Sequence, residues 1–191
     1  DDIWRHHCSQ MLRIRAIFLK LDRTFVAKGN ACNARSLWDM GLQQFCCQLT
    51  GTPDVERKTV EGLIALVNRE RDGDAIDHAR LHSLLRMFSA VGTYERAFER
   101  PFLLSTSDYY KAEAERLIVE ADIPAYLRHA ELRLNQELER AVQDLDPTTR
   151  KPLISIAEQR LVADHVTAIL DKGFDGMCND RQLDDLRRCF T

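Results

Sequence analysis

The stretch from Ile123 to Asp146 places the strongest constraint on the fold of this chain. At 3.6 residues per turn, its apolar and polar residues fall on opposite sides of a helix. Pro124 suits the first helical turn, and Asp146-Pro147 should end the helix because a residue before proline avoids the helical region. We therefore expect a long amphipathic helix. Its apolar side comprises Tyr126, Leu127, Ala130, Leu134, Leu138, Ala141, Val142 and Leu145, and its polar side mainly Arg128, Asn135, Gln136, Glu139, Arg140 and Gln143.

The rest of the chain shows the same helical periodicity, broken by turn residues. A kink or a restart is expected near Pro101, and a break or a bend at Gly173. No segment alternates like a β-strand, so the sequence predicts an all-α fold. A long helix followed closely by another occurs at 3–28 and 35–49 and again at 123–146 and 149–172, and this order hints at a stacked helical array. The other helices are expected at 3–28, 35–49, from Thr52 or Asp54 to Arg71, from Asp77 to Gly92, 94–120, 149–172 and from Asp180 onward.

The first predicted helix, residues 3–28, has an unusually wide apolar face. Its apolar residues cover more than half of the helical wheel, and a face this wide needs two neighbours. One neighbour could be the rest of this domain, and the other could be residues outside this sequence or a partner protein. The apolar residues are Ile3, Trp4, Cys8, Met11, Leu12, Ile14, Ile17, Phe18, Leu19, Leu21, Phe25 and Val26.

Composition argues against several functional classes. The net charge is −3 with both signs interspersed, so we expect no direct binding of nucleic acid. The apolar runs are too short to span a membrane. Six cysteines without a C-x-x-C pair suggest reduced thiols in a cytosolic or nuclear protein. The sequence starts without Met and stops within an apolar-periodic run, so we interpret it as a fragment.

The candidate chemical groups have ordinary structural explanations. His78 and His82 have metal-ligand spacing, but no third ligand lies nearby in sequence. Cys46-Cys47 could supply a nucleophile, although core packing is the simpler interpretation for Cys46, and His6-His7-Cys8 is weaker still. We therefore expect no catalytic residue, cofactor or metal. We also expect solvated charges at Arg69-Glu70-Arg71 and surface ion pairs among Glu131, Arg133, Glu137 and Arg140.

Several stretches, in the same order along nearly the whole chain, resemble the cullin family and most closely its cullin-4 branch. The most specific are Ser36-Leu37-Trp38-Asp39-Met40-Gly41-Leu42 and Arg150-Lys151-Pro152-Leu153-Ile154. The others are Met11–Arg15, Leu21–Val26, Phe45, Arg69–Arg71 with Gly73, Tyr94, Phe98-Glu99, Phe102-Leu103, Thr106, Tyr110, Glu113, Ile123-Pro124, Tyr126-Leu127, Arg133-Leu134, Glu137 and Arg140.

The resemblance implies part of a cullin N-terminal stalk made of stacked five-helix cullin repeats. Residues 1–31 would be the last helix of repeat one, 32–147 repeat two, and 148–191 the truncated start of repeat three. Cullins are scaffolds of RING ubiquitin ligases in the nucleus and cytoplasm. Their N-terminal tip binds an adaptor, in cullin-4 the β-propeller damaged-DNA-binding protein one, and a C-terminal domain outside this sequence binds the RING-box subunit. The residues expected nearest the adaptor are Arg23, Thr24, Phe25 and Lys28, although Phe25 could equally be core.

Three functional hypotheses follow. The leading one is a rigid, non-catalytic spacer between the two ends of a ligase, which depends on interfacial apolar residues such as Trp38, Phe102 and Leu134. The second is a helical interaction module of a non-cullin complex. The third, far weaker, is a small helical enzyme that uses the histidines.

Overall fold

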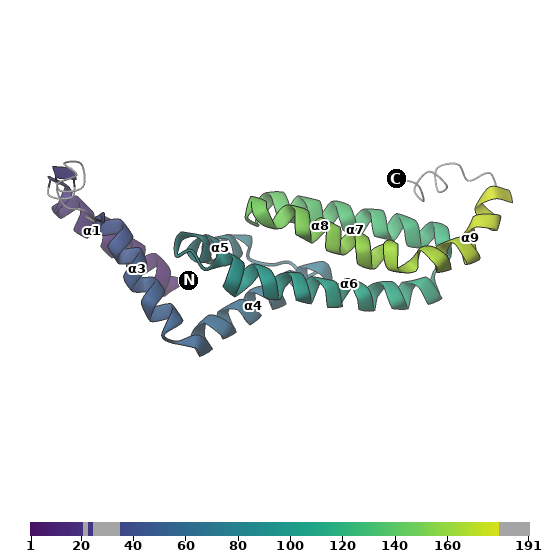
Figure 1. Cartoon of the computed structure of the whole chain (residues 1–191), viewed down its shortest axis with the longest axis horizontal. Coiled ribbons are helices and arrows are strands. Elements are labelled where there is room, and N and C mark those ends of the chain that lie inside the picture. Colours follow the sequence, from purple (N-terminus) through teal and green to yellow (C-terminus); the bar gives the residue numbers. More distant parts are fainter. Residues whose placement is uncertain (21–22, 25–34, 180–191) are drawn as a thin grey trace. The chain divides into compact units, whose positions relative to one another are not determined.

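A computed structural model of the chain describes residues 1–20, 23–24 and 35–179 (Figure 1). These residues form helices joined by short turns and include no strand, which confirms the all-α prediction. They divide into two compact units, Asp1–Phe98 and Glu99–Thr191. The helices are α1 (Asp2–Ile17), α3 (Leu37–Thr50), α4 (Pro53–Arg71), α5 (His78–Ala90), α6 (Arg100–Glu120), α7 (Ile123–Gln143), α8 (Pro147–Leu161) and α9 (Val166–Asn179), with a π-helical turn η1 (Tyr94–Glu99) and a 3₁₀ turn η2 (Ala163–His165).

In the N-terminal unit the predicted helix boundaries at 77–92 are confirmed. Asp77 caps α5 by accepting a hydrogen bond from the backbone N–H of Arg80 at 3.0 Å. Gly73 and Gly92 follow α4 and α5 with φ values of 98° and 73°, a left-handed conformation that glycine adopts without a Cβ clash. The buried side chains of these two helices form much of the core of this unit: Val60, Leu63, Val67, Leu81, Leu85, Met87 and Phe88.

Helix α1 ends earlier than predicted. The expected helix 3–28 stops at Ile17, and Phe18 forms a turn with φ −98° and ψ 19° before helical residues resume at 19–20 and 23–24. Ile17 is 76% exposed and Phe18 48%. Helices in proteins depend mainly on tertiary packing, and this part of the chain has little of it within the described residues.

Close packing against α1 explains a glycine in α3. A Cβ placed on Gly41 would lie 2.5 Å from Met11 Cε and 2.9 Å from its Cγ. The His7 ring also contacts this point, with Nε2 3.2 Å from the Gly41 carbonyl oxygen. A larger residue at this position would therefore require the Met11 side chain to move.

We expect Gly41→Ala to lower the free energy of unfolding of the N-terminal unit by about 1–3 kcal/mol, because the added methyl overpacks the α1–α3 contact. Met11→Ala should relieve most of this cost in the double variant. Urea unfolding followed by tryptophan fluorescence measures both effects, since Trp4 and Trp38 lie in this unit. Additive energies in the double-mutant cycle would show that the methyl and Met11 do not meet.

A π-helical turn precedes α6 at the place where a kink or a restart was expected from Pro101. Residues Tyr94–Glu99 form η1, and α6 begins at Arg100 with proline in its first turn. Proline has no N–H and its ring crowds the carbonyl four residues earlier, so a regular α-helix cannot run through this point unchanged.

In the C-terminal unit, α6, α7 and α8 pack along one another around a shared core (Figure 1). Asp122 caps α7 by accepting from the Ala125 N–H at 2.7 Å. Helix α7 ends at Gln143, three residues before the predicted end, and Asp146 instead caps α8. The core comprises Tyr110, Ala114, Ile118, Ile123, Tyr126, Leu127, Ala130, Ala157, Leu161 and Ile169.

The expected single helix 149–172 is two helices. Val162 leaves the helical conformation with φ −121° and ψ −61°, and η2 separates α8 from α9. The Leu161 carbonyl instead accepts a hydrogen bond from the Tyr126 hydroxyl of α7 at 2.6 Å. A contact from another helix thus satisfies the backbone at the break. Gly173, where a break or a bend was expected, does not end α9, which continues to Asn179.

Candidate protein-interaction surface

The predicted adaptor contacts fall only partly within the described residues. Arg23 and Thr24 are exposed, and the Thr24 hydroxyl donates a hydrogen bond to the Lys20 carbonyl at 2.7 Å. Phe25 and Lys28 lie outside the described residues. A partner-binding role for the four residues stays a prediction.

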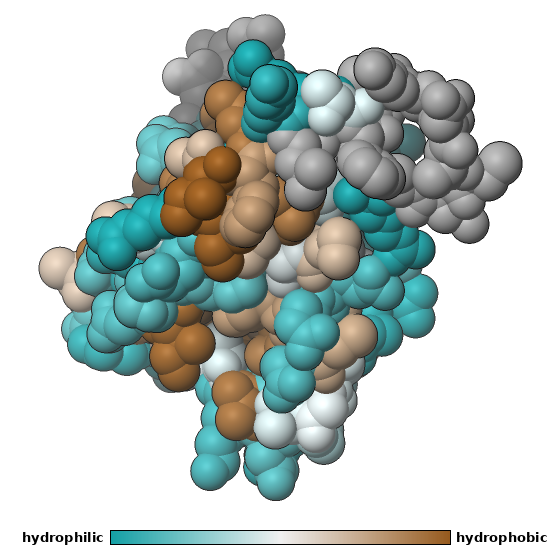
Figure 2. All heavy atoms as spheres, turned by 90° about the vertical axis from the view of Figure 1, so that its left-hand side faces the viewer, coloured by the Kyte–Doolittle hydropathy of each residue, from teal (hydrophilic) through white to brown (hydrophobic). Residues whose placement is uncertain are grey.

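Helix α1 exposes most of its apolar side chains. Trp4 is its one buried residue, whereas Ile3 is 80% exposed and Leu12 56%. Figure 2 shows apolar side chains at the surface, among polar ones, on the face that carries α1 and α3. This exposed set is the second side of the wide face predicted from the sequence. Besides Ile3 and Leu12, the exposed apolar set includes Ile14 and Ile17 on α1, Phe18 and Leu19 just after it, and Met40 on α3.

The other side of α1 is anchored on α3 by an aromatic cluster. The Trp4 and Phe45 rings pack edge to face with centroids 5.1 Å apart, and the His7 ring lies 5.0 Å from Phe45. One helix thus supplies the first neighbour that the wide face needs. The exposed apolar side chains Ile3, Ile14 and Ile17 flank this contact, whereas the side of α1 opposite to it carries polar residues such as Ser9 and Arg13.

Charged residues expected at the surface are buried in the C-terminal unit. Arg133 is 14% exposed and Glu113 is 8% exposed; the Arg133 Nε lies 3.1 Å from Glu113 Oε1, and its Nη2 2.5 Å from the same oxygen. His129 joins this pair, with Nε2 3.3 Å from Glu113 Oε1. Arg133 is therefore half-buried and not at the surface, where it was predicted to lie, because its partner Glu113 comes from α6, outside the amphipathic pattern of α7.

A second buried pair lies one helical turn further along α7. The Glu137 side chain is fully buried and pairs with Arg140, which is 6% exposed. The Tyr110 hydroxyl of α6 donates to Glu137 Oε1 at 2.5 Å. The predicted surface placement of Glu137 and Arg140 is therefore wrong, and only Glu131 of the four is exposed as expected. Conversely Val142, expected on the buried side, is 65% exposed.

Arg71 departs from the sequence prediction in the same way. It was expected in a solvated last turn of α4 but is 3% exposed, and its guanidinium donates to Asn68 Oδ1 at 2.9 Å. Its neighbour Arg69 behaves as predicted and forms an exposed pair with Asp74. Both units thus hold buried cations with polar partners.

Tyr126 is the group whose titration the fold changes most clearly. Burial raises the pKa of Tyr126 to about 12, and the nearby Glu113 carboxylate adds to the rise. The pKa is higher in the folded state than the ordinary value of 10.0, so folding favours the protonated phenol. The resulting stability is present below about pH 10 and lost as the pH rises toward 12.

We expect the C-terminal unit to lose stability between about pH 10 and 12, and Tyr126→Phe to flatten that loss. Absorbance at 295 nm should show Tyr126 deprotonating late, and the late component should shrink by one tyrosine in the variant. A wild-type unfolding profile that is flat across this range would contradict the assignment.

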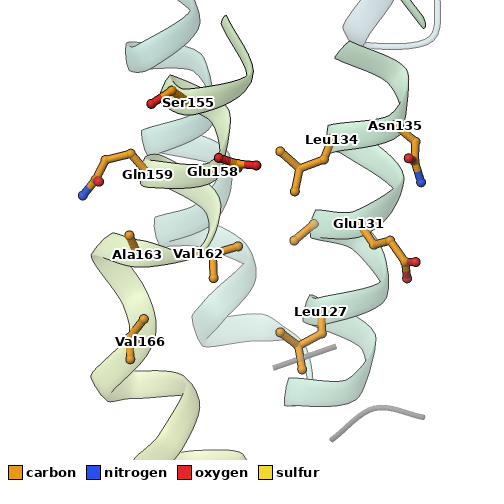
Figure 3. A pocket seen from close by; sticks show the side chains of 11 residues that line it. Leu127, Glu131, Leu134, Asn135, Ser155, Glu158, Gln159, Val162, Ala163 and Val166 are labelled. Atoms are coloured by element: carbon orange, nitrogen blue, oxygen red, sulfur yellow. The ribbon is translucent and has the colours of Figure 1, made fainter. Parts of the chain in front are cut away.

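A groove of about 640 Å³ runs between α7 and the α8–α9 break (Figure 3). Leu127 and Leu134 line one side, and Val162 and Val166 the other. Glu131 and Glu158 also line it. The lining holds no cysteine or histidine, and its one hydroxyl belongs to Ser155. This set of side chains suits contact with protein better than chemistry.

The histidine and cysteine candidates are not assembled into a site. His78 is half-exposed, with Nε2 3.6 Å from Glu70 Oε1. Among the described residues no group of three or more His, Cys, Asp or Glu is placed to hold a metal ion. Cys46, expected in the core, is half-buried, and Cys47 is exposed. Burial raises the pKa of the Cys8 thiol, the opposite of what activates a nucleophile.

Comparison with known proteins bears directly on the resemblance. The family model described as the cullin alpha solenoid domain matches residues 1–191. Human Cullin-4A is 42% identical over 187 residues, which cover 98% of this chain. The chain belongs to the cullin family. Cullin-4 of Dictyostelium discoideum is 40% identical over 190 residues, whereas Cullin-3 of the same organism is 30% identical over 196.

The chain spans about a quarter of the length of these cullins: the aligned region covers 24% of human Cullin-4A and 23% of the Dictyostelium Cullin-4. The similarity confirms the cullin-4-like resemblance and the helical solenoid fold. The repeat boundaries at 31/32 and 147/148 stay predictions. None of the helices in the described part of this cullin is long and apolar enough to cross a membrane.

Proposed function

We propose that this chain is a non-catalytic spacer segment in the scaffold of a cullin-RING E3 ubiquitin ligase. It would hold the adaptor and substrate-receptor end at a fixed separation from the RING-binding end, and so support ubiquitin-dependent protein catabolism in the nucleus and cytoplasm. Membership of the cullin family supports the scaffold role.

The interlocked packing of α6, α7 and α8 carries the spacer proposal. Two buried charge clusters join α6 to α7, through Glu113 with Arg133 and through Tyr110 with Glu137. A one-residue slip of either helix would separate these charges inside the unit, at a cost of several kcal/mol. A spacer requires a fixed helical register, because rigidity raises the effective concentration of the substrate near the enzyme that carries ubiquitin.

The proposed partner at the N-terminal end is the β-propeller adaptor, damaged-DNA-binding protein one, and Arg23, Thr24, Phe25 and Lys28 are the proposed contacts. The exposed apolar side of α1 favours a protein contact at this end. The RING-box subunit would bind a domain outside this sequence. No direct contact with nucleic acid, membrane or a cofactor is proposed.

Adaptor binding is tested by a pull-down of the purified β-propeller protein. One bait is this chain and the other is the chain extended at its N-terminus by the preceding residues of a cullin-4. Binding by the extended chain supports the cullin-4 assignment, and loss of that binding in Arg23→Glu supports the predicted contact. Failure of both baits, each folded and helical by circular dichroism, would refute the adaptor proposal.

The spacer role is tested in a full-length cullin that carries this segment. A flexible Gly/Ser linker of about twenty residues inserted after Phe98 should reduce substrate ubiquitination by about tenfold or more, because it dilutes the tethered ends. Binding of adaptor and RING-box subunit should not change. The same linker at the exposed turn after Gly73, within one unit, is the matched control. Equal activity of the two insertions would contradict a rigid spacer.

A further inference from the structure

A second groove lies within the N-terminal unit and shares Ile3 with the exposed apolar side of α1. It has a volume of about 420 Å³ and is lined by parts of α1, α3, α4 and α5. Its apolar lining includes Leu49, Leu63 and Met87, which are 8%, 1% and 4% exposed. At its edges Ile3 and Val55 are 80% and 54% exposed. This is an apolar channel with exposed apolar edges and no covering element among the described residues.

A glycine in the middle of α4 faces this channel. Gly62 lines the groove, and a Cβ built on it would meet nothing within 4 Å among the described residues. Glycine inside a helix costs stability relative to alanine. The contact with the Met11 side chain explains why position 41 is a glycine. The described residues include no such contact at Gly62. Close approach of another backbone would provide one, since helices cross most closely at small residues.

The charge around the groove is basic. Lys58 and Arg80 line it, and neither side chain makes an ion pair with the described residues. The one acidic side chain in the lining, Asp1, is already paired with Arg5 at 2.8 Å and accepts a hydrogen bond from Ser83 at 2.7 Å. An occupant that matches this lining would carry apolar side chains flanked by carboxylates.

We propose that this groove docks an amphipathic helix of a partner protein, with its apolar face against Leu63 and Met87 and its backbone passing close to Gly62. Acidic side chains flanking that face pair with Lys58 and Arg80. A helix fits because apolar residues spaced by three and four positions fill a groove of this kind. The inference goes beyond the scaffold role and does not depend on the adaptor or on ubiquitin transfer.

The test is a selection from a phage-displayed library of 18-residue helical peptides on the 191-residue chain. The matched pair of variants is Gly62→Leu, which fills the groove, and Glu61→Leu, which adds the same side chain to the neighbouring exposed position outside the groove. Circular dichroism checks that both are folded. Gly62→Leu should remain folded because the space at its Cβ is open.

We expect the enriched peptides to combine an apolar helical face with flanking Asp or Glu. In fluorescence anisotropy the best peptide should bind the wild type and Glu61→Leu alike, and Gly62→Leu at least tenfold more weakly. The double charge reversal Lys58→Glu/Arg80→Glu should weaken binding to a similar degree. A further variant, Gly62→Ala, should raise the melting temperature and at the same time weaken peptide binding. A glycine with only a structural role would not show these two effects together.

Three results would overturn the proposal: no enriched peptide, enrichment of Lys or Arg flanks, or equal binding to wild type and Gly62→Leu. Sedimentation of the chain alone provides the remaining outcome. If the wild type self-associates and Gly62→Leu is monomeric, a second copy occupies the groove, and the proposed partner helix is wrong.

Discussion

Replacing Glu137 with alanine should lower the free energy of unfolding of the C-terminal unit by about 3–5 kcal/mol. The Glu137 side chain is fully buried, pairs with Arg140 and accepts a hydrogen bond from the Tyr110 hydroxyl. Its removal takes the carboxylate partner from a guanidinium that is only 6% exposed. A buried charge that loses its counter-charge costs far more than the pair contributes when intact.

Matched variants separate charge from hydrogen bonding at this site. Tyr110→Phe removes one hydrogen bond and should cost only about 1–2 kcal/mol, whereas Glu137→Gln keeps the shape and removes the charge. Native-state hydrogen exchange of the α6–α8 amides measures all three, because both tryptophans lie in the other unit. If Glu137→Ala costs no more than Tyr110→Phe, the pairing with Arg140 contributes nothing to this unit.

The helices themselves were largely predictable from the sequence. Caps such as Asp77 and stops such as Gly92 act within a few residues, so local chemistry specifies them. The sequence did not predict the two helix breaks at Phe18 and Val162, and these breaks have a different cause. At Val162 the break is accompanied by a hydrogen bond from Tyr126, a residue 36 positions earlier, and helical periodicity carries no information about such a contact.

The buried charges show where amphipathic patterns fail. Arg133, Glu137 and Arg140 look like solvated residues because a helical wheel treats every charge as exposed. Their partners Glu113 and Tyr110 lie on α6, 20 and 27 residues away. One clue was present in the sequence: all five positions carry the cullin resemblance. The exposed apolar side chains of α1 were predicted better, because the excess width of its apolar face could be counted on a helical wheel. The adaptor contacts stay a prediction.

Phe102→Ala is the second variant for which we expect a large effect. The Phe102 side chain is fully buried in α6, so its loss should cost about 3–5 kcal/mol through lost burial and the cavity left behind. Leu134, expected from the sequence to be equally important, is only partly buried and lines the groove beside α7. Leu134→Ala should therefore cost about 1–2 kcal/mol, since part of its surface already contacts solvent.

Urea unfolding of the two variants, monitored by hydrogen exchange of the α6 and α7 amides, tests whether Phe102→Ala costs more stability than Leu134→Ala. The comparison also bears on how the spacer is built. If Phe102 dominates, the rigidity of the C-terminal unit lies in its closed core, and the groove at Leu134 is free to contact another protein surface. If Leu134→Ala is as costly as Phe102→Ala, Leu134 contributes to the core of this unit as much as Phe102 does.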